Sequence, residues 1–164
     1  MKKILVTGNA GSGKTAFSSD LARALQIRLW RLDSIVWKPG WQETSIEERR
    51  EKIQVLVDGD SWVIDGVSSQ VFLAADTVFF LDIPLYRCVF NIVKRFFYNG
   101  FKTRESLPAN CPEIFGVFKA IKIAFIYQKV TRPIILNVIA ENRQKKIVWI
   151  RTYGELAKHQ PVAL

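Results

Sequence analysis

Gly8-Asn9-Ala10-Gly11-Ser12-Gly13-Lys14-Thr15 decides the fold of this chain, because it matches the pattern G-x-x-x-x-G-K-[ST]. The residues before it, Lys3-Ile4-Leu5-Val6-Thr7, are a short apolar run that predicts a buried strand. The residues after it, 16–26, place their large apolar side chains on one face of a predicted helix. Strand, glycine-rich loop and helix in this order distinguish a phosphate-binding loop, or P-loop, from a chance match.

Each part of this loop has a chemical role. The glycines let backbone N–H groups turn inward around a phosphate, and the helix N-terminus adds its partial positive charge. Lys14 can reach the β- and γ-phosphates, and the Thr15 hydroxyl can bind Mg²⁺. ATP and Mg²⁺ are therefore the expected cofactors. The expected nucleotide-binding residues in this region are Gly8, Asn9, Ala10, Gly11, Ser12, Gly13, Lys14, Thr15 and Ala16.

Composition narrows the class of protein. The 164 residues, 49% of them hydrophobic, predict one globular domain over residues 1–164. Cys88 and Cys111 fit neither a disulfide framework nor a metal spacing, and His159 is the single histidine. A zinc site built on histidines or a Ser-His-Asp triad is thus disfavoured, and a reducing cytoplasm is the expected compartment.

The net charge of +9 suits phosphate-rich partners, which include nucleotides, nucleic acid and anionic lipid. The stretch from Arg87 to Arg104 holds five basic residues and no acidic one. It is either a solvated basic face or a segment that covers phosphates. The apolar stretch 114–130 is interrupted by lysines, which predicts an amphipathic helix and no membrane span. We also expect no signal peptide at the N-terminus, and the sequence does not indicate an oligomeric state.

Strands and helices are expected to alternate along the chain. The predicted strands are residues 3–7, 28–32, 61–64, 77–81 and 146–150. The predicted helices are residues 16–26, 45–58, 85–99, 114–131, 134–141 and 155–159, with a break before Pro133. Ser45 and Glu48 form a capping box, and Ile46 is expected to face inward with Ile53, Leu56 and Val57. The pattern predicts an α/β fold, a parallel sheet with helices on both faces.

Ligands of such sheets bind beyond the carboxyl ends of the strands. Asp33, Asp65, Asp82 and Arg151 each come just after a predicted strand. Asp65 is expected to complete the metal site of Thr15 by holding a water bound to Mg²⁺, unless it is only the carboxylate of a strand-end turn. Asp82, which precedes Ile83-Pro84, is interpreted as structural.

The chain resembles the adenylate, shikimate and gluconate kinase group of P-loop proteins, and more closely an adenylate-kinase-related family named DNA topology modulation proteins. The resembling pieces are the P-loop, Leu32-Asp33, Trp37-Lys38-Pro39-Gly40-Trp41, Trp62-Val63-Ile64-Asp65-Gly66, residues 75–84, Thr103-Arg104 and Asn110-Cys111-Pro112-Glu113. The resemblance implies a three-layer fold of the nucleoside and shikimate kinase type with five parallel strands. It also implies an acceptor-side segment near residues 34–60 and a lid near residues 96–113.

The resemblance further implies catalytic roles for Lys14, Asp33, Arg95 and Arg104. Asp33 would orient an acceptor hydroxyl or act as general base, or else cap a helix or turn. Arg95 and Arg104 would close over the phosphates, or else be solvated at the surface. Arg151 lies where those kinases have their adenine-side loop. Trp37 and Trp41 either line the acceptor pocket or pack against the next helix.

Three hypotheses follow. The first is an ATP- and Mg²⁺-dependent kinase that acts on a small-molecule or nucleotide acceptor. The second is a nucleotide-binding regulator of DNA topology or transcription, although no recognisable DNA-binding module is visible in the sequence. The third is a plain NTPase that needs no acceptor.

Overall fold

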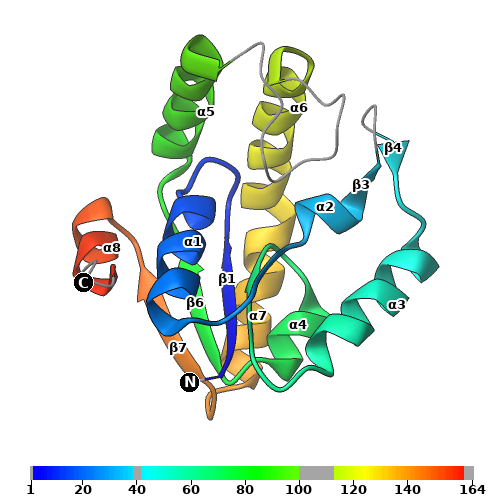
Figure 1. Cartoon of the computed structure of the whole chain (residues 1–164). Coiled ribbons are helices and arrows are strands. Elements are labelled where there is room, and N and C mark those ends of the chain that lie inside the picture. Colours follow the sequence, from blue (N-terminus) through cyan, green and yellow to red (C-terminus); the bar gives the residue numbers. More distant parts are fainter. Residues whose placement is uncertain (1, 39–41, 100–112, 161–164) are drawn as a thin grey trace.

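A computed structural model describes residues 2–38, 42–99 and 113–160, and its core is a five-stranded parallel sheet (Figure 1). The strand order across the sheet is β2-β5-β1-β6-β7. These strands are β1 Lys3–Gly8, β2 Leu29–Arg31, β5 Trp62–Asp65, β6 Thr77–Leu81 and β7 Lys146–Ile150. Each overlaps a predicted strand, so the predicted α/β fold is confirmed. The P-loop strand β1 lies in the middle, with Val6 paired to Asp65 on one side and to Phe79 on the other.

Helices cover both faces of the sheet, because successive strand residues point in opposite directions. Ile4 and Val6 pack with residues of α1 (Lys14–Leu25) and α8 (Tyr153–His159). Leu5 and Val78 pack on the opposite face. That face is covered by α3 (Ile46–Val57), α4 (Ser69–Ala74) and α7 (Arg132–Glu141). The expected helix 85–99 is present as α5 (Leu85–Asn99).

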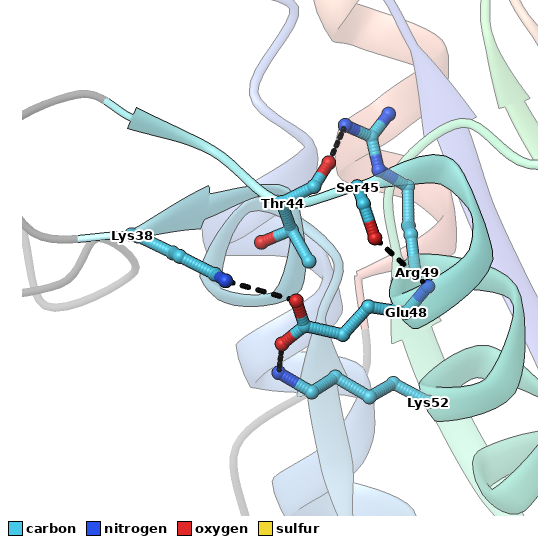
Figure 2. Close-up of polar contacts among 6 residues, drawn as sticks. All are labelled: Lys38, Thr44, Ser45, Glu48, Arg49 and Lys52. Carbon is cyan, nitrogen blue, oxygen red and sulfur yellow. Dashed lines mark hydrogen bonds and ion pairs between the residues drawn. The ribbon is translucent and has the colours of Figure 1, made fainter.

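Helix α3 begins at the predicted cap and is tied to a small hairpin, β3 (Trp37–Lys38) and β4 (Gln42–Glu43). Ser45 Oγ accepts a hydrogen bond from the Glu48 N–H at 3.2 Å (Figure 2). The Glu48 carboxylate accepts from Lys38 Nζ at 2.9 Å and from Lys52 Nζ at 2.8 Å. These hydrogen bonds, first that from Lys52 and then that from Lys38, lower the pKa of Glu48 to about 2.

Two details of the sequence prediction were wrong or incomplete near α3. Ile46 was expected to face inward but is 64% exposed, whereas Ile53 and Val57 are buried. Only the second half of α3 packs on the core, so a residue in its first turn finds no apolar partner. The short helices α2 (Asp33–Val36) and α4 were not predicted, because segments of this length carry too little periodicity.

The predicted break before Pro133 was also wrong. Helix α6 (Glu113–Ile126) continues through a π-helical turn, Tyr127–Thr131, into α7. Within this turn the Arg132 N–H donates to Tyr127 O, five residues earlier. The wider turn ends two residues before the proline, which has no N–H of its own, and the helix passes the ring without ending.

The resulting long helix is apolar. Over Val117–Glu141 it is long and apolar enough to cross a membrane, judged by length and composition alone, with a mean hydropathy of 1.2. This is weak evidence for a span, since core helices of soluble proteins meet the same criteria. That the chain has no membrane span therefore stays a prediction.

Candidate functional site

The P-loop closely approaches helix α5 and adopts the conformation that its glycines allow. Gly11 and Gly13 have φ angles of 77° and 95°, in the left-handed region that side chains disfavour. A Cβ on Gly11 would overlap Cys88 O and lie 3.0 Å from Ile92 Cγ1. The loop conformation and the close packing on α5 therefore both require glycine at position 11.

Lys14 folds back over the loop. Its Nζ donates a hydrogen bond to Asn9 O at 2.8 Å. Lys14 also lines the cleft in front of the loop, where its ammonium can meet a bound phosphate. Asn9 and Ser12 are buried in the loop, whereas Ala16 is exposed at the start of α1.

Thr15 and Asp65 come together from different parts of the chain. Thr15 Oγ1 donates to Asp65 Oδ2 at 2.9 Å, and the Asp65 side chain is buried where β5 ends beside β1. Hydroxyl and carboxylate oxygens are the ligands that Mg²⁺ prefers. Within the part of the chain that the structure describes, no group of three or more His, Cys, Asp or Glu side chains could hold a metal. Two protein oxygens fit Mg²⁺, which takes its other ligands from phosphates and water.

Two polar side chains from distant helices brace the loop, and one side chain of the loop reaches out to the long helix. Asn91 Nδ2 on α5 donates to Gly11 O at 2.9 Å and also to the Tyr153 hydroxyl. The Tyr153 hydroxyl in turn lies 3.4 Å from Gly11 O, and the loop residue Asn9 donates through Nδ2 to Ala124 O at 3.0 Å. Sequence reasoning missed this role for Asn91 and Tyr153, since nothing in their local sequence indicates a contact with residues 62 or more positions away.

A cleft of about 550 Å³ opens in front of the loop. Asp33 lines it from the start of α2, Asp65 from the end of β5, and Arg95 from α5. Lys119 and Tyr127 line it from the long helix and were not predicted as site residues. The burial of Tyr127 raises the pKa of its hydroxyl above the ordinary value, so this group is neutral in the cleft.

The cleft thus brings together Lys14, Thr15, Asp65, Asp33 and Arg95, but not every predicted residue. Arg151 does not line it: the side chain is exposed, with its guanidinium 4.6 Å from the centre of the Trp149 ring. Arg104 and Trp41 lie outside the described residues, as do the side chain of Trp37 and residues 100–112 of the predicted lid.

Asp82 has a structural environment. Its carboxylate accepts from Arg132 Nε and Nη2, both at 2.7 Å, and from Trp149 Nε1 at 3.2 Å. The aspartate side chain is 9% exposed. This bidentate pair fixes the long helix to the end of β6, and Asp82 is not among the residues that line the cleft.

The fold and the loop together define a P-loop protein of the α/β class. No family model matches the chain, and no curated protein matches it in sequence. Among solved structures, shikimate kinase from Bacteroides thetaiotaomicron is 14% identical, with 94% of this chain and 91% of that chain covered and a TM-score of 0.46. Deoxyadenosine kinase from M. mycoides with bound dATP is 10% identical, with 94% of this chain and 95% of that chain covered and a TM-score of 0.47.

A gluconokinase from Sinorhizobium meliloti is 12% identical, with 83% of this chain and 97% of that chain covered and a TM-score of 0.41. All three proteins are kinases by name. The likenesses are distant and carry no argument about activity, so the function has to be argued from the site itself.

Proposed function

We propose that this protein is an ATP- and Mg²⁺-dependent phosphotransferase that moves the γ-phosphate of ATP to a small acceptor. The observation that carries the proposal is the hydrogen bond of 2.9 Å between Thr15 and Asp65 beside Lys14. It joins the P-loop helix to the adjacent strand end, and the cleft in front of it also holds Asp33 and Arg95. A carboxylate and cations around one cleft suit phosphoryl transfer, which depends on positioning and charge neutralisation.

Each of these residues has a role in the proposal. The backbone N–H groups of the loop hold the phosphates, and Lys14 neutralises the charge of the transferring group. Thr15 and Asp65 would hold Mg²⁺, which when bound neutralises phosphate charge and orients it. Asp33 would accept a hydrogen bond from the acceptor hydroxyl and align it for attack. Arg95 and Lys119 would add positive charge from the helix side of the cleft.

The size of the cleft limits the acceptor. About 550 Å³ lies in the range of small-molecule sites and accommodates a nucleoside or a hydroxy acid beside the nucleotide phosphates.

The resemblance to DNA topology modulation proteins rests on sequence motifs alone, and a cytoplasmic localisation is part of the same proposal. A role for Arg104 in closing the site, and for Arg151 beside the adenine, is likewise part of it.

The test is transfer of labelled γ-phosphate from ATP in the presence of Mg²⁺, screened over nucleoside monophosphates, nucleosides and small hydroxy acids. We expect one class of acceptor to become labelled, and we expect Lys14→Ala to lower the rate by about 10²–10³-fold. Lys158→Ala, an exposed lysine on α8, is the matched control and should keep full activity. Phosphate release that no acceptor accelerates would make the protein a plain NTPase, and equal activity of Lys14→Ala would contradict the site.

Asp33 is tested separately. Asp33→Asn should lower kcat by about 10²–10⁴-fold with little change in the affinity for ATP, because the side chain is proposed to act on the acceptor. Asp60→Asn, at an exposed position between α3 and β5, removes the same charge outside the cleft and should have no effect. A loss of ATP affinity without a loss of kcat would exclude the acceptor role.

A further inference from the structure

Helix α5 presents an unusual surface to the solvent. Its outward side carries Tyr86, Phe90, Phe97 and Tyr98, which are between 66% and 79% exposed. At 100° per residue these positions fall within one third of the helix circumference, with Lys94 among them. An outward helix face is ordinarily polar, so large aromatic residues gathered on one side indicate an interaction surface.

The long helix repeats this pattern. Over Val117–Glu141 only 17% of its most apolar window is buried, unlike the core helix of a soluble protein. Lys122 and Lys129 lie on its exposed side among apolar residues that are between 47% and 81% exposed. These apolar residues are Phe118, Phe125, Ile126, Val130 and Ile134. Apolar side chains with lysines at their centre thus form the outward side of this helix as well.

The charge along these two helices is positive except at the two ends of the long helix, where Glu113 and Glu141 stand. No acidic residue occurs in residues 83–99 or in residues 114–140, while Arg87, Lys94, Lys122 and Lys129 are exposed. Helix α5 packs against α6, and Figure 1 shows both helices extending past the end of β1 that carries the P-loop. We call these outward sides the aromatic–basic face.

We propose that the aromatic–basic face binds the surface of an anionic lipid bilayer. Aromatic side chains favour the headgroup level, aliphatic ones the boundary of the acyl chains, and lysines the anionic headgroups. A nucleic acid would leave Ile126 and Val130 without a suitable partner. A second copy bound through the same face would place like charges together. The face therefore matches a membrane surface best in both its charge and its apolar character.

The opposite side of the long helix is tied to the core, so the proposal has this helix lie on the bilayer surface without crossing it. Tyr127 and Ile135 are buried in a core cluster with Phe80 of the central sheet. Arg132 is bound to Asp82 through two hydrogen bonds of 2.7 Å. Insertion across a bilayer would break this packing and these bonds, whereas surface binding uses only residues that are already exposed.

The experiment is vesicle flotation of the full chain, with equal parts phosphatidylcholine and phosphatidylglycerol against phosphatidylcholine alone. We expect binding to the anionic vesicles only, and weaker binding as salt rises. Lys94→Glu/Lys122→Glu should weaken partitioning by at least about 25-fold, because each basic residue contributes about fivefold. Phe90→Ser/Phe118→Ser should weaken it as well, through lost apolar burial.

The matched controls are Lys158→Glu on α8 and Val55→Ser on α3, where the valine is 75% exposed. Both should bind like the unchanged protein, and circular dichroism checks that every variant is folded. Equal losses in the controls, equal binding to neutral vesicles, or resistance to alkaline carbonate extraction would each overturn the proposal. Failure to bind vesicles would also overturn the proposal. In that case, binding of duplex DNA or dimer formation in sedimentation would identify the aromatic–basic face as a surface for nucleic acid or for a second copy. None of these outcomes depends on kinase activity, so this proposal and the proposed function can fail separately.

Discussion

Replacing Gly11 by alanine tests the conformation and the packing of the P-loop at once. The residue has a φ of 77°, and an added Cβ would overlap the backbone oxygen of Cys88 on α5. A side chain in left-handed backbone costs about 1–2 kcal/mol. Forcing an extra methyl group against a packed neighbour costs about 1–3 kcal/mol more. We therefore expect Gly11→Ala to lower the free energy of unfolding by about 2–5 kcal/mol.

Gly13→Ala is the matched control, since it carries the strain without the overlap. Its φ is 95°, but an added Cβ would lie 3.7 Å from Leu156 Cδ2 and 3.8 Å from Tyr153 Cε1, which are ordinary contacts. The expected loss is about 1–2 kcal/mol. For a chain of this length each kcal/mol lowers Tm by about 2–4 °C, so the two variants are distinguishable by thermal melting.

The assay is urea unfolding followed by circular dichroism, together with the Tm of each variant. Gly11→Ala should be the less stable of the two by about 1–3 kcal/mol. If the two variants lose the same stability, the close approach of the loop to α5 does not exist in solution and the description of the site is wrong.

Three further perturbations address the framework around the site. Arg132→Ala leaves the buried carboxylate of Asp82 without its bidentate partner and should lower the free energy of unfolding by about 3 kcal/mol. This is the lower end of the range for a broken buried ion pair, because the Arg132 side chain is 30% exposed. In urea unfolding, the double variant Arg132→Ala/Asp82→Asn should recover part of this loss. The pKa of Glu48 is lowered to about 2 from its ordinary 4.5, so the charged carboxylate stabilises the fold above pH 4.5, and this effect is lost as the pH falls through about 2. In the variant Lys38→Met, an NMR titration should show the pKa of Glu48 rising toward 4.5. An unchanged pKa would refute the contact between Lys38 and Glu48. Burial raises the pKa of the Cys88 thiol to about 11, so iodoacetamide at pH 8 should label its peptide in urea but not in the folded protein, as read by mass spectrometry.

Much of the central architecture could be predicted from local sequence. The strand Lys3–Gly8 and the motif that follows it are decisive, because an apolar run, glycines and a helix signal coincide there. Thr77–Leu81 was predictable as a continuous apolar strand in the middle of a covered sheet. Ser45 marked the start of α3, since a capping box carries its own local hydrogen bond.

Contacts between distant elements could not be predicted. Lys119 and Tyr127 reach the cleft from a helix whose only local signal was apolar content. Asn91 resembles any polar residue of an amphipathic helix until α5 is placed beside the P-loop. The continuation past Pro133 depends on a π-helical turn, for which the sequence carries no signal that we recognise.

The central claim is that Lys14, Thr15 and Asp65 form one magnesium–nucleotide site, and calorimetric titration with ATP tests it most directly. We predict that ATP binds with Mg²⁺ present, that Asp65→Asn removes the dependence on Mg²⁺, and that Lys14→Ala weakens binding while Lys158→Ala does not. Binding of ATP that is unaffected by Mg²⁺ and by these site variants, or no binding of ATP at all, would contradict the claim.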